Sequence, residues 1–124
     1  MKPEVVFGLE NAVWPAVLVN TSGAVLLTNA AAKSFFGANL TGEAANLAAV
    51  WSPENGGTAV DFLTRWEQAP AASGVLKFKT ANGTVSPFLT TVCQFTSDGK
   101  KWFVLQLFLF EQKLLASFKV SNIS

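Results

Sequence analysis

The chain has 124 residues, half of them hydrophobic and 14% charged, with eleven Phe, four Trp and no His. This length and apolar content fit a single globular domain and exclude a disordered chain. The absence of His removes the residue that most catalytic triads, zinc sites and neutral-pH proton transfers require. Nothing else in the sequence specifies a catalytic or metal site, so we expect a protein that is not an enzyme.

Net charge, cysteine content and the length of the apolar stretches limit the partners and the cellular compartment that we expect. The formal net charge of +1 argues against a nucleic-acid surface. Cys93 is the single cysteine, so an internal disulfide is excluded, and we expect a cytoplasmic protein. The longest apolar stretch, residues 102–110, is too short to span a bilayer, and we predict no membrane insertion.

The first part of the chain predicts a helix and a hairpin. Pro3 suits a first helical turn and Pro15 ends the helix, so residues 1–14 form an amphipathic leader. Residues 16–19 and 24–28 favour β structure and flank a turn that contains Gly23.

The middle of the chain is predicted to be helical. Asn29 can cap a short helix over residues 30–36, and Gly37 can end that helix in the left-handed conformation. Further helical turns are expected at residues 43–51 and 59–67, separated by a breaker that contains Pro, Asn and two Gly.

From residue 73 onward the hydrophobic period changes to two. Asn82-Gly83 and Asp98-Gly99 are hairpin turns, and strands are expected on both sides of each. The last strand is apolar in both phases, which predicts that both of its faces are covered. One phase carries Trp102, Val104, Phe108 and Phe110, and the other carries Phe103, Leu105, Leu107 and Leu109.

The order and spacing of these pieces resemble the PAS domain, a sensory module of histidine kinases, cyclic-dinucleotide enzymes and transcription regulators. The resemblance runs from Leu9 to Phe110 and includes an Asn-x-Ala helix start at Asn29, the pair Phe36-Gly37, and the Asn82-Gly83 entry into the last hairpin. It implies an α+β fold, a five-stranded antiparallel sheet with helices packed on one face. Other open sheets packed on helices, such as GAF-like or profilin-like folds, are the alternative.

The resemblance also implies a division of the chain and a setting for it. Residues 1–14 would be the N-terminal amphipathic helix, 15–110 the PAS-like domain and 111–124 the start of a C-terminal connector. We therefore expect a signal-transduction domain that acts on an output domain of the same parent chain.

Different PAS domains hold different ligands between sheet and helices, and the residues of this sequence argue against some of these ligands. Haem held by histidine is excluded because the chain has no His. Flavin is disfavoured because Phe78 and Phe88 stand where flavin-binding members have amides, and a buried flavin edge needs polar partners. A small apolar ligand or no ligand is left, and we predict no cofactor.

A cavity of this kind would have an aromatic wall on the helices and an inner sheet face opposite. Gln106 would be its polar group, either for ligand sensing or bonded to water or main chain at an edge position. The alternative is an aromatic core packed without a cavity. The predicted lining is Trp51, Phe62, Trp66, Phe78, Phe88, Thr90, Val92, Val104 and Gln106.

The second functional hypothesis is an interaction module that binds no ligand and dimerises its parent protein. Its basis is the two-sided apolar last strand together with the amphipathic leader, since such a surface left uncovered favours aggregation. We expect a homodimer under either hypothesis. The predicted interface is Val5, Val6, Leu9, Val13, Phe103, Leu105 and Leu107.

Overall fold

Five strands form one antiparallel sheet in the computed structural model, which describes residues 9–42, 44–68 and 74–109. The order across the sheet is β2-β1-β5-β4-β3, so the last strand of the chain lies in the middle. The strands are β1 Ala16–Asn20, β2 Val25–Thr28, β3 Gly74–Lys79, β4 Val85–Ser97 and β5 Lys100–Leu109.

The predicted turns connect these strands. Gly23 has a φ of +80° between β1 and β2, and Gly83 has +87° between β3 and β4. Asp98 and Gly99, with φ of +55° and +75°, connect β4 to β5. Two consecutive residues with positive φ match the right-handed twist of the flanking strands, which is why an Asp-Gly pair suits this hairpin.

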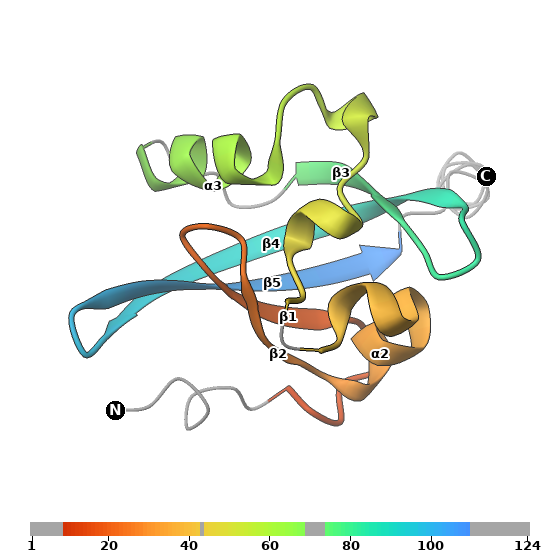
Figure 1. Cartoon of the computed structure of the whole chain (residues 1–124), viewed down its shortest axis with the longest axis horizontal. Coiled ribbons are helices and arrows are strands. Elements are labelled where there is room, and N and C mark those ends of the chain that lie inside the picture. The colour runs from red at the N-terminus through yellow and green to blue at the C-terminus, as the bar shows by residue number, and fades with distance from the viewer. Residues whose placement is uncertain (1–8, 43, 69–73, 110–124) are drawn as a thin grey trace, which may run out of the picture.

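Two α-helices and short 3₁₀ turns cross one face of the sheet (Figure 1). Helix α2, Ala30–Phe36, is capped by Asn29 as predicted, and α3 covers Ala59–Gln68. Gly37 has the expected positive φ of 58°, but its ψ of −140° lies outside the left-handed helical region.

Of the helical turns expected at residues 43–51, the described part contains a single 3₁₀ turn, Leu47–Ala49. The backbone there is bonded to the β1–β2 hairpin instead: the Val25 N–H donates to the Ala45 carbonyl (2.9 Å) and the Leu47 N–H donates to the Gly23 carbonyl (2.8 Å). Asn46 between them is extended, and its side chain accepts from the Ala48 N–H. These partners replace the hydrogen bonds of a helix.

The leader is not helical where the structure describes it. Residues 9–14 contain a turn, in which the Ala12 N–H donates to the Leu9 carbonyl at 3.2 Å, followed by a bend. Residues 1–8, where most of the predicted amphipathic helix falls, lie outside the described residues.

The core lies between the inner face of the sheet, the face that the helices cover, and the helical middle. Helical residues such as Phe36, Leu47 and Leu63 pack there and are at most 1% exposed. The sheet contributes Val17, Val19, Phe78, Phe88, Phe103, Leu105 and Leu107. Burial of these side chains supplies the main driving force for folding.

The free edge of β3 is covered by the segment that precedes α3. The Lys79 N–H donates to the Val50 carbonyl at 2.8 Å. The Asn55 carboxamide both accepts from the Lys77 N–H and donates to the Lys77 carbonyl, each at 2.8 Å. A side-chain amide thus substitutes for a neighbouring strand at that position, which protects the edge from pairing with another chain.

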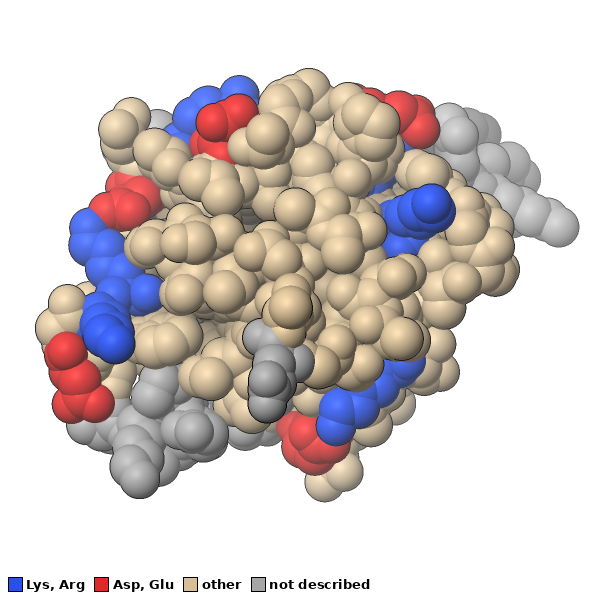
Figure 2. Space-filling view, in the orientation of Figure 1, with Lys and Arg blue, Asp and Glu red and all other residues tan. Residues whose placement is uncertain are grey.

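Charged side chains lie around the rim of the face shown in Figure 2, with both signs interspersed and an uncharged middle. The face shown therefore carries no basic patch of the kind typical of a nucleic-acid surface. Within the described ranges, no helix has the length and hydropathy to cross a membrane.

Candidate functional site

Most of the predicted cavity-lining residues come together on the inner face. Thr90 is 2% exposed, and its hydroxyl hydrogen-bonds the Phe88 carbonyl at 3.2 Å. Trp51 and Val92 pack against the core and are half-buried. Phe62 also packs there, and Trp66 stands edge-on to Phe103 with ring centroids 5.9 Å apart.

The centre of this region is a cluster of phenylalanine rings. Phe36, Phe78 and Phe88 are fully buried, and their centroids lie 5.8 to 6.2 Å apart. Trp51 adds an edge-on contact to Phe78 at 5.6 Å. Rings at these separations touch, so a ligand in this place would have to displace one of them.

The face assignment of the last strand is reversed in the structure. Leu105 pairs with Val17 of β1, and both belong to the core under the helices. Val104 and Gln106 therefore point to the opposite face, here called the outer face, and do not line the space between sheet and helices. Alternation specifies two faces of a strand, but when both are apolar it does not say which one the helices cover.

The predicted dimer interface is corrected for the same reason. Phe103, Leu105 and Leu107 are 0% exposed in the core and present no surface to a second subunit. Val13 is 86% exposed, whereas Leu9 is half-buried and its carbonyl accepts a hydrogen bond from Asn29. Val5 and Val6 lie outside the described residues.

On the outer face, Trp14 covers the end of β5. Its indole N–H donates to the Gln106 side-chain oxygen at 2.9 Å, and its ring lies 5.2 Å from that of Phe108. Gln106 is thus in the central strand and bonded to a tryptophan, an arrangement that neither sequence interpretation of this residue included. Trp14, next to Pro15 at the start of β1, links the N-terminal segment to the middle of the sheet.

Asn29 holds that N-terminal segment in place. Its side chain is fully buried and makes four hydrogen bonds, each 2.8 or 2.9 Å long. The oxygen accepts from the N–H groups of Ala16 and Ala32, and the amide nitrogen donates to the carbonyls of Leu9 and Trp14. One side chain therefore joins the N-terminal segment, β1 and the start of α2.

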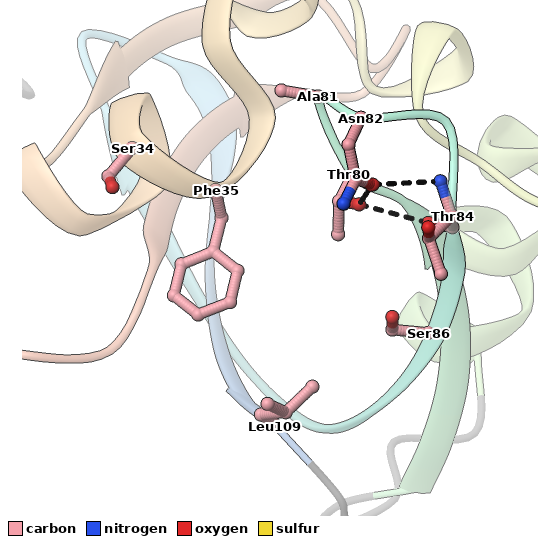
Figure 3. A pocket seen from close by; sticks show the side chains of 8 residues that line it. All are labelled: Ser34, Phe35, Thr80, Ala81, Asn82, Thr84, Ser86 and Leu109. Atoms are coloured by element: carbon pink, nitrogen blue, oxygen red, sulfur yellow. Dashed lines mark hydrogen bonds between the residues drawn. The ribbon is translucent and has the colours of Figure 1, made fainter.

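A pocket of about 410 Å³ lies at the end of the sheet, between α2 and the β3–β4 hairpin. Figure 3 shows Phe35 on one side, the hairpin residues on the other and Leu109 at the bottom of the view. It is lined by Ser34, Phe35, Thr80, Ala81, Asn82, Thr84, Ser86 and Leu109.

Sequence reasoning missed this hairpin pocket and the role of Trp14. The signal for the pocket is the density of Thr and Ser around the Asn82-Gly83 turn, a feature that the turn alone does not require. The signal for Trp14 is a large aromatic directly before the first strand, but its partner Gln106 lies 92 residues away. Contacts of that separation follow from the topology and not from local pattern.

We searched the described residues for side chains that could bind a metal ion together. No group of three or more His, Cys, Asp or Glu residues lies close enough there to hold a metal ion. Cys93 is exposed on β4.

Comparisons with known proteins give matches at the level of structure. No protein-family model matches the sequence, and no curated protein matches it at a significant level. A PAS domain from Desulfitobacterium hafniense superposes with a TM-score of 0.67 at 17% identity, over 83% of this chain and 98% of that one.

Two further solved PAS domains also match the fold of this chain. The PAS domain of the Cronobacter turicensis quorum-sensing receptor RpfR, in complex with C12:0, gives a TM-score of 0.62 at 14% identity, over 82% of this chain and 97% of that one. The PAS domain of nitrogen regulation protein NR(II) from Vibrio parahaemolyticus gives 0.59 at 16% identity, over 82% and 94%. The chain therefore has the PAS fold.

Proposed function

We propose that the chain is a cytoplasmic, non-catalytic signal-transduction domain of a larger regulatory protein and that it works through protein contacts. The parent would be a histidine kinase, a cyclic-dinucleotide enzyme or a transcription regulator. Support comes from the PAS fold and from structural neighbours described as parts of a sensor histidine kinase, a quorum-sensing receptor and a nitrogen regulation protein.

The observation that carries the proposal is the packed phenylalanine cluster. Phe36, Phe78 and Phe88 are each 0% exposed and in mutual contact where an apolar ligand would otherwise sit. Opening that space would cost the packing of a buried aromatic ring, about 3–5 kcal/mol by analogy with truncation of Phe in protein cores. Because the inner face is packed, we infer that contacts with a partner protein are made through the outer face.

The partner we propose is a second copy of this chain. Exposed apolar side chains lie on the outer face of β3 and β4, where Val75, 48% exposed, stands directly opposite Leu89, 36% exposed. Lys77 and Lys79 follow along the same face. Burial of the apolar pair would favour association, while the lysines limit how closely two copies can approach.

Native mass spectrometry and light scattering test this proposal together. We expect the purified chain to carry no apolar molecule and to be a dimer whose fraction falls on dilution. Leu89→Lys should shift it to monomer, whereas Val60→Lys, on α3 and 41% exposed, is the matched control and should not. A monomer at all concentrations, or Val60→Lys acting like Leu89→Lys, would contradict the dimer.

A receptor for an apolar ligand is the second candidate. The observation in its favour is the rim of half-buried aromatics, Trp51, Phe62 and Trp66, beside the cluster. The RpfR domain, similar in fold, is described in complex with C12:0. Thermal unfolding with dodecanoic acid decides between the two: a saturable rise in Tm supports the receptor, and an unchanged Tm supports the contact module.

A further inference from the structure

We propose that the hairpin pocket binds a small uncharged ring compound that carries hydroxyl groups, such as a monosaccharide or a cyclic polyol. The pocket lies outside the phenylalanine cluster, so the inference is independent of whether the inner face holds an apolar ligand. Its volume of about 410 Å³ falls within the usual range for small-molecule sites.

The walls of the pocket are fixed to one another before any ligand arrives. The Ala81 N–H in the hairpin donates to the Phe35 carbonyl at the end of α2, at 2.8 Å. Gly37 approaches the same point, since a Cβ built on it would lie 3.3 Å from the Ala81 methyl group. A pocket whose two walls are bonded in this way needs little ordering when it binds a ligand.

The hairpin itself is held by a side-chain network. The Asn82 oxygen accepts from the Thr84 N–H at 3.0 Å and lies 2.6 Å from the Thr80 hydroxyl. Both acceptor sites of that oxygen are thereby in use, which fixes the orientation of the amide. The two N–H donors of Asn82 and the Ser86 hydroxyl have no hydrogen-bond partner among the described residues.

The chemistry of the lining selects the ligand class. The eight lining residues include hydroxyl and amide groups but no Asp, Glu, Lys or Arg, so a charged ligand would find no counter-ion. Hydroxyl groups on a ligand can accept from Asn82 and exchange hydrogen bonds with Ser86. Phe35 and Leu109 supply apolar surface for the carbon face of a ring.

The location links this site to the end of the sheet. Leu109 is the last residue of β5 and is 42% exposed at the pocket. A ligand there would touch α2, the β3–β4 hairpin and the end of the central strand at once. Occupancy would thereby connect all three elements, of which the Ala81–Phe35 hydrogen bond joins α2 to the hairpin and the β4–β5 pairing joins the hairpin to Leu109.

The test is an NMR titration of the ¹⁵N-labelled chain with two probes, D-glucose and myo-inositol, followed through backbone amide shifts. We expect saturable shifts at Thr80, Asn82 and Ser86 with at least one probe, and a dissociation constant on the order of millimolar for so small a ligand. D-glucuronate, which adds a carboxylate to the glucose ring, should bind more weakly.

Asn82→Asp is the informative variant because it keeps an oxygen acceptor for the turn and replaces the two N–H donors with a second oxygen and a negative charge, and the control below carries the same added charge outside the pocket. We expect it to weaken binding about tenfold, which is the effect of losing roughly one hydrogen bond. Asn11→Asp, at an exposed position outside the pocket, is the matched control. The proposal is overturned if neither probe gives saturable shifts, if the shifts lie elsewhere, or if Asn82→Asp binds as well as the control.

Discussion

The two faces of β5 carry similar residues and have different surroundings. On the inner face Phe103, Leu105 and Leu107 are fully buried under the helices. On the outer face Val104, Gln106 and Phe108 are half-buried, and the described contacts there come from Trp14. The inner face is held by many small packing contacts between side chains. Among the described residues, the hydrogen bond and the ring contact on the outer face of β5 come from Trp14.

That difference indicates which face can rearrange at the lower energetic cost. A packed core changes only if whole rings move, because protein interiors have few voids. A single hydrogen bond and one ring contact can form or break at a cost of about 1 kcal/mol. The Trp14 side-chain contacts with Gln106 and Phe108 are therefore easier to break than the packing of the inner face.

Leu105→Ala should give the largest loss of stability, because it removes a side chain from the packing of the inner face. Loss of a fully buried Leu side chain costs about 2–5 kcal/mol of unfolding free energy, which urea denaturation measures. Val104→Ala, its neighbour on the outer face, should cost about 1 kcal/mol.

The control for this comparison is Leu26→Ala, the same truncation at a side chain of β2 that is 41% exposed and lies outside the proposed dimer contact. It should cost clearly less than Leu105→Ala. If Val104→Ala destabilised the protein more than Leu105→Ala, the faces of β5 would be assigned the wrong way round.

Asn29→Ala should give an intermediate effect, because it removes the side chain that ties the N-terminal segment to α2. We expect a loss of about 1–3 kcal/mol from the unpaired buried groups. Asn29→Ser retains a helix cap to Ala32 and should recover about 1 kcal/mol of it. A serine variant as stable as the original would show that the bonds to Leu9 and Trp14 contribute nothing.

The smallest effect is expected for the Trp14–Gln106 hydrogen bond, measured by a double-mutant cycle with Trp14→Phe and Gln106→Leu. The coupling energy should be about 0.5–1.5 kcal/mol, the usual net value of one hydrogen bond. Both changes keep apolar volume, so the Phe108 contact is largely retained. Additive effects of the two substitutions would mean that the outer face lacks this specific link.

Local features of the fold were predictable because their causes are local. Asn29 caps α2 and Asp98-Gly99 forms a hairpin turn, since each requirement is met within a few residues. The helical turns expected at 43–51 are shortened to one 3₁₀ turn, because the Ala45 carbonyl and the Leu47 N–H bond to the β1–β2 hairpin, about twenty residues earlier. Helical propensity is weak and gives way to such contacts.

The candidate site was predicted only in part. Phe78 and Phe88 come together as expected, because large apolar side chains that alternate along a strand are usually buried in the core. The hairpin pocket could not be predicted, since it needs α2, the hairpin and the end of β5 to meet in one corner.

Sequence pattern alone predicts the five strands and their order, their turns and the resemblance to the PAS domain, because capping, turn geometry and hydrophobic period act over short distances. Which side of β5 is inside follows only from tertiary contacts. With both phases apolar, that choice depends on pairing with Val17 and Val19 of β1 and on the place of Trp66 above Phe103. These are long-range contacts, whose energies no local pattern records.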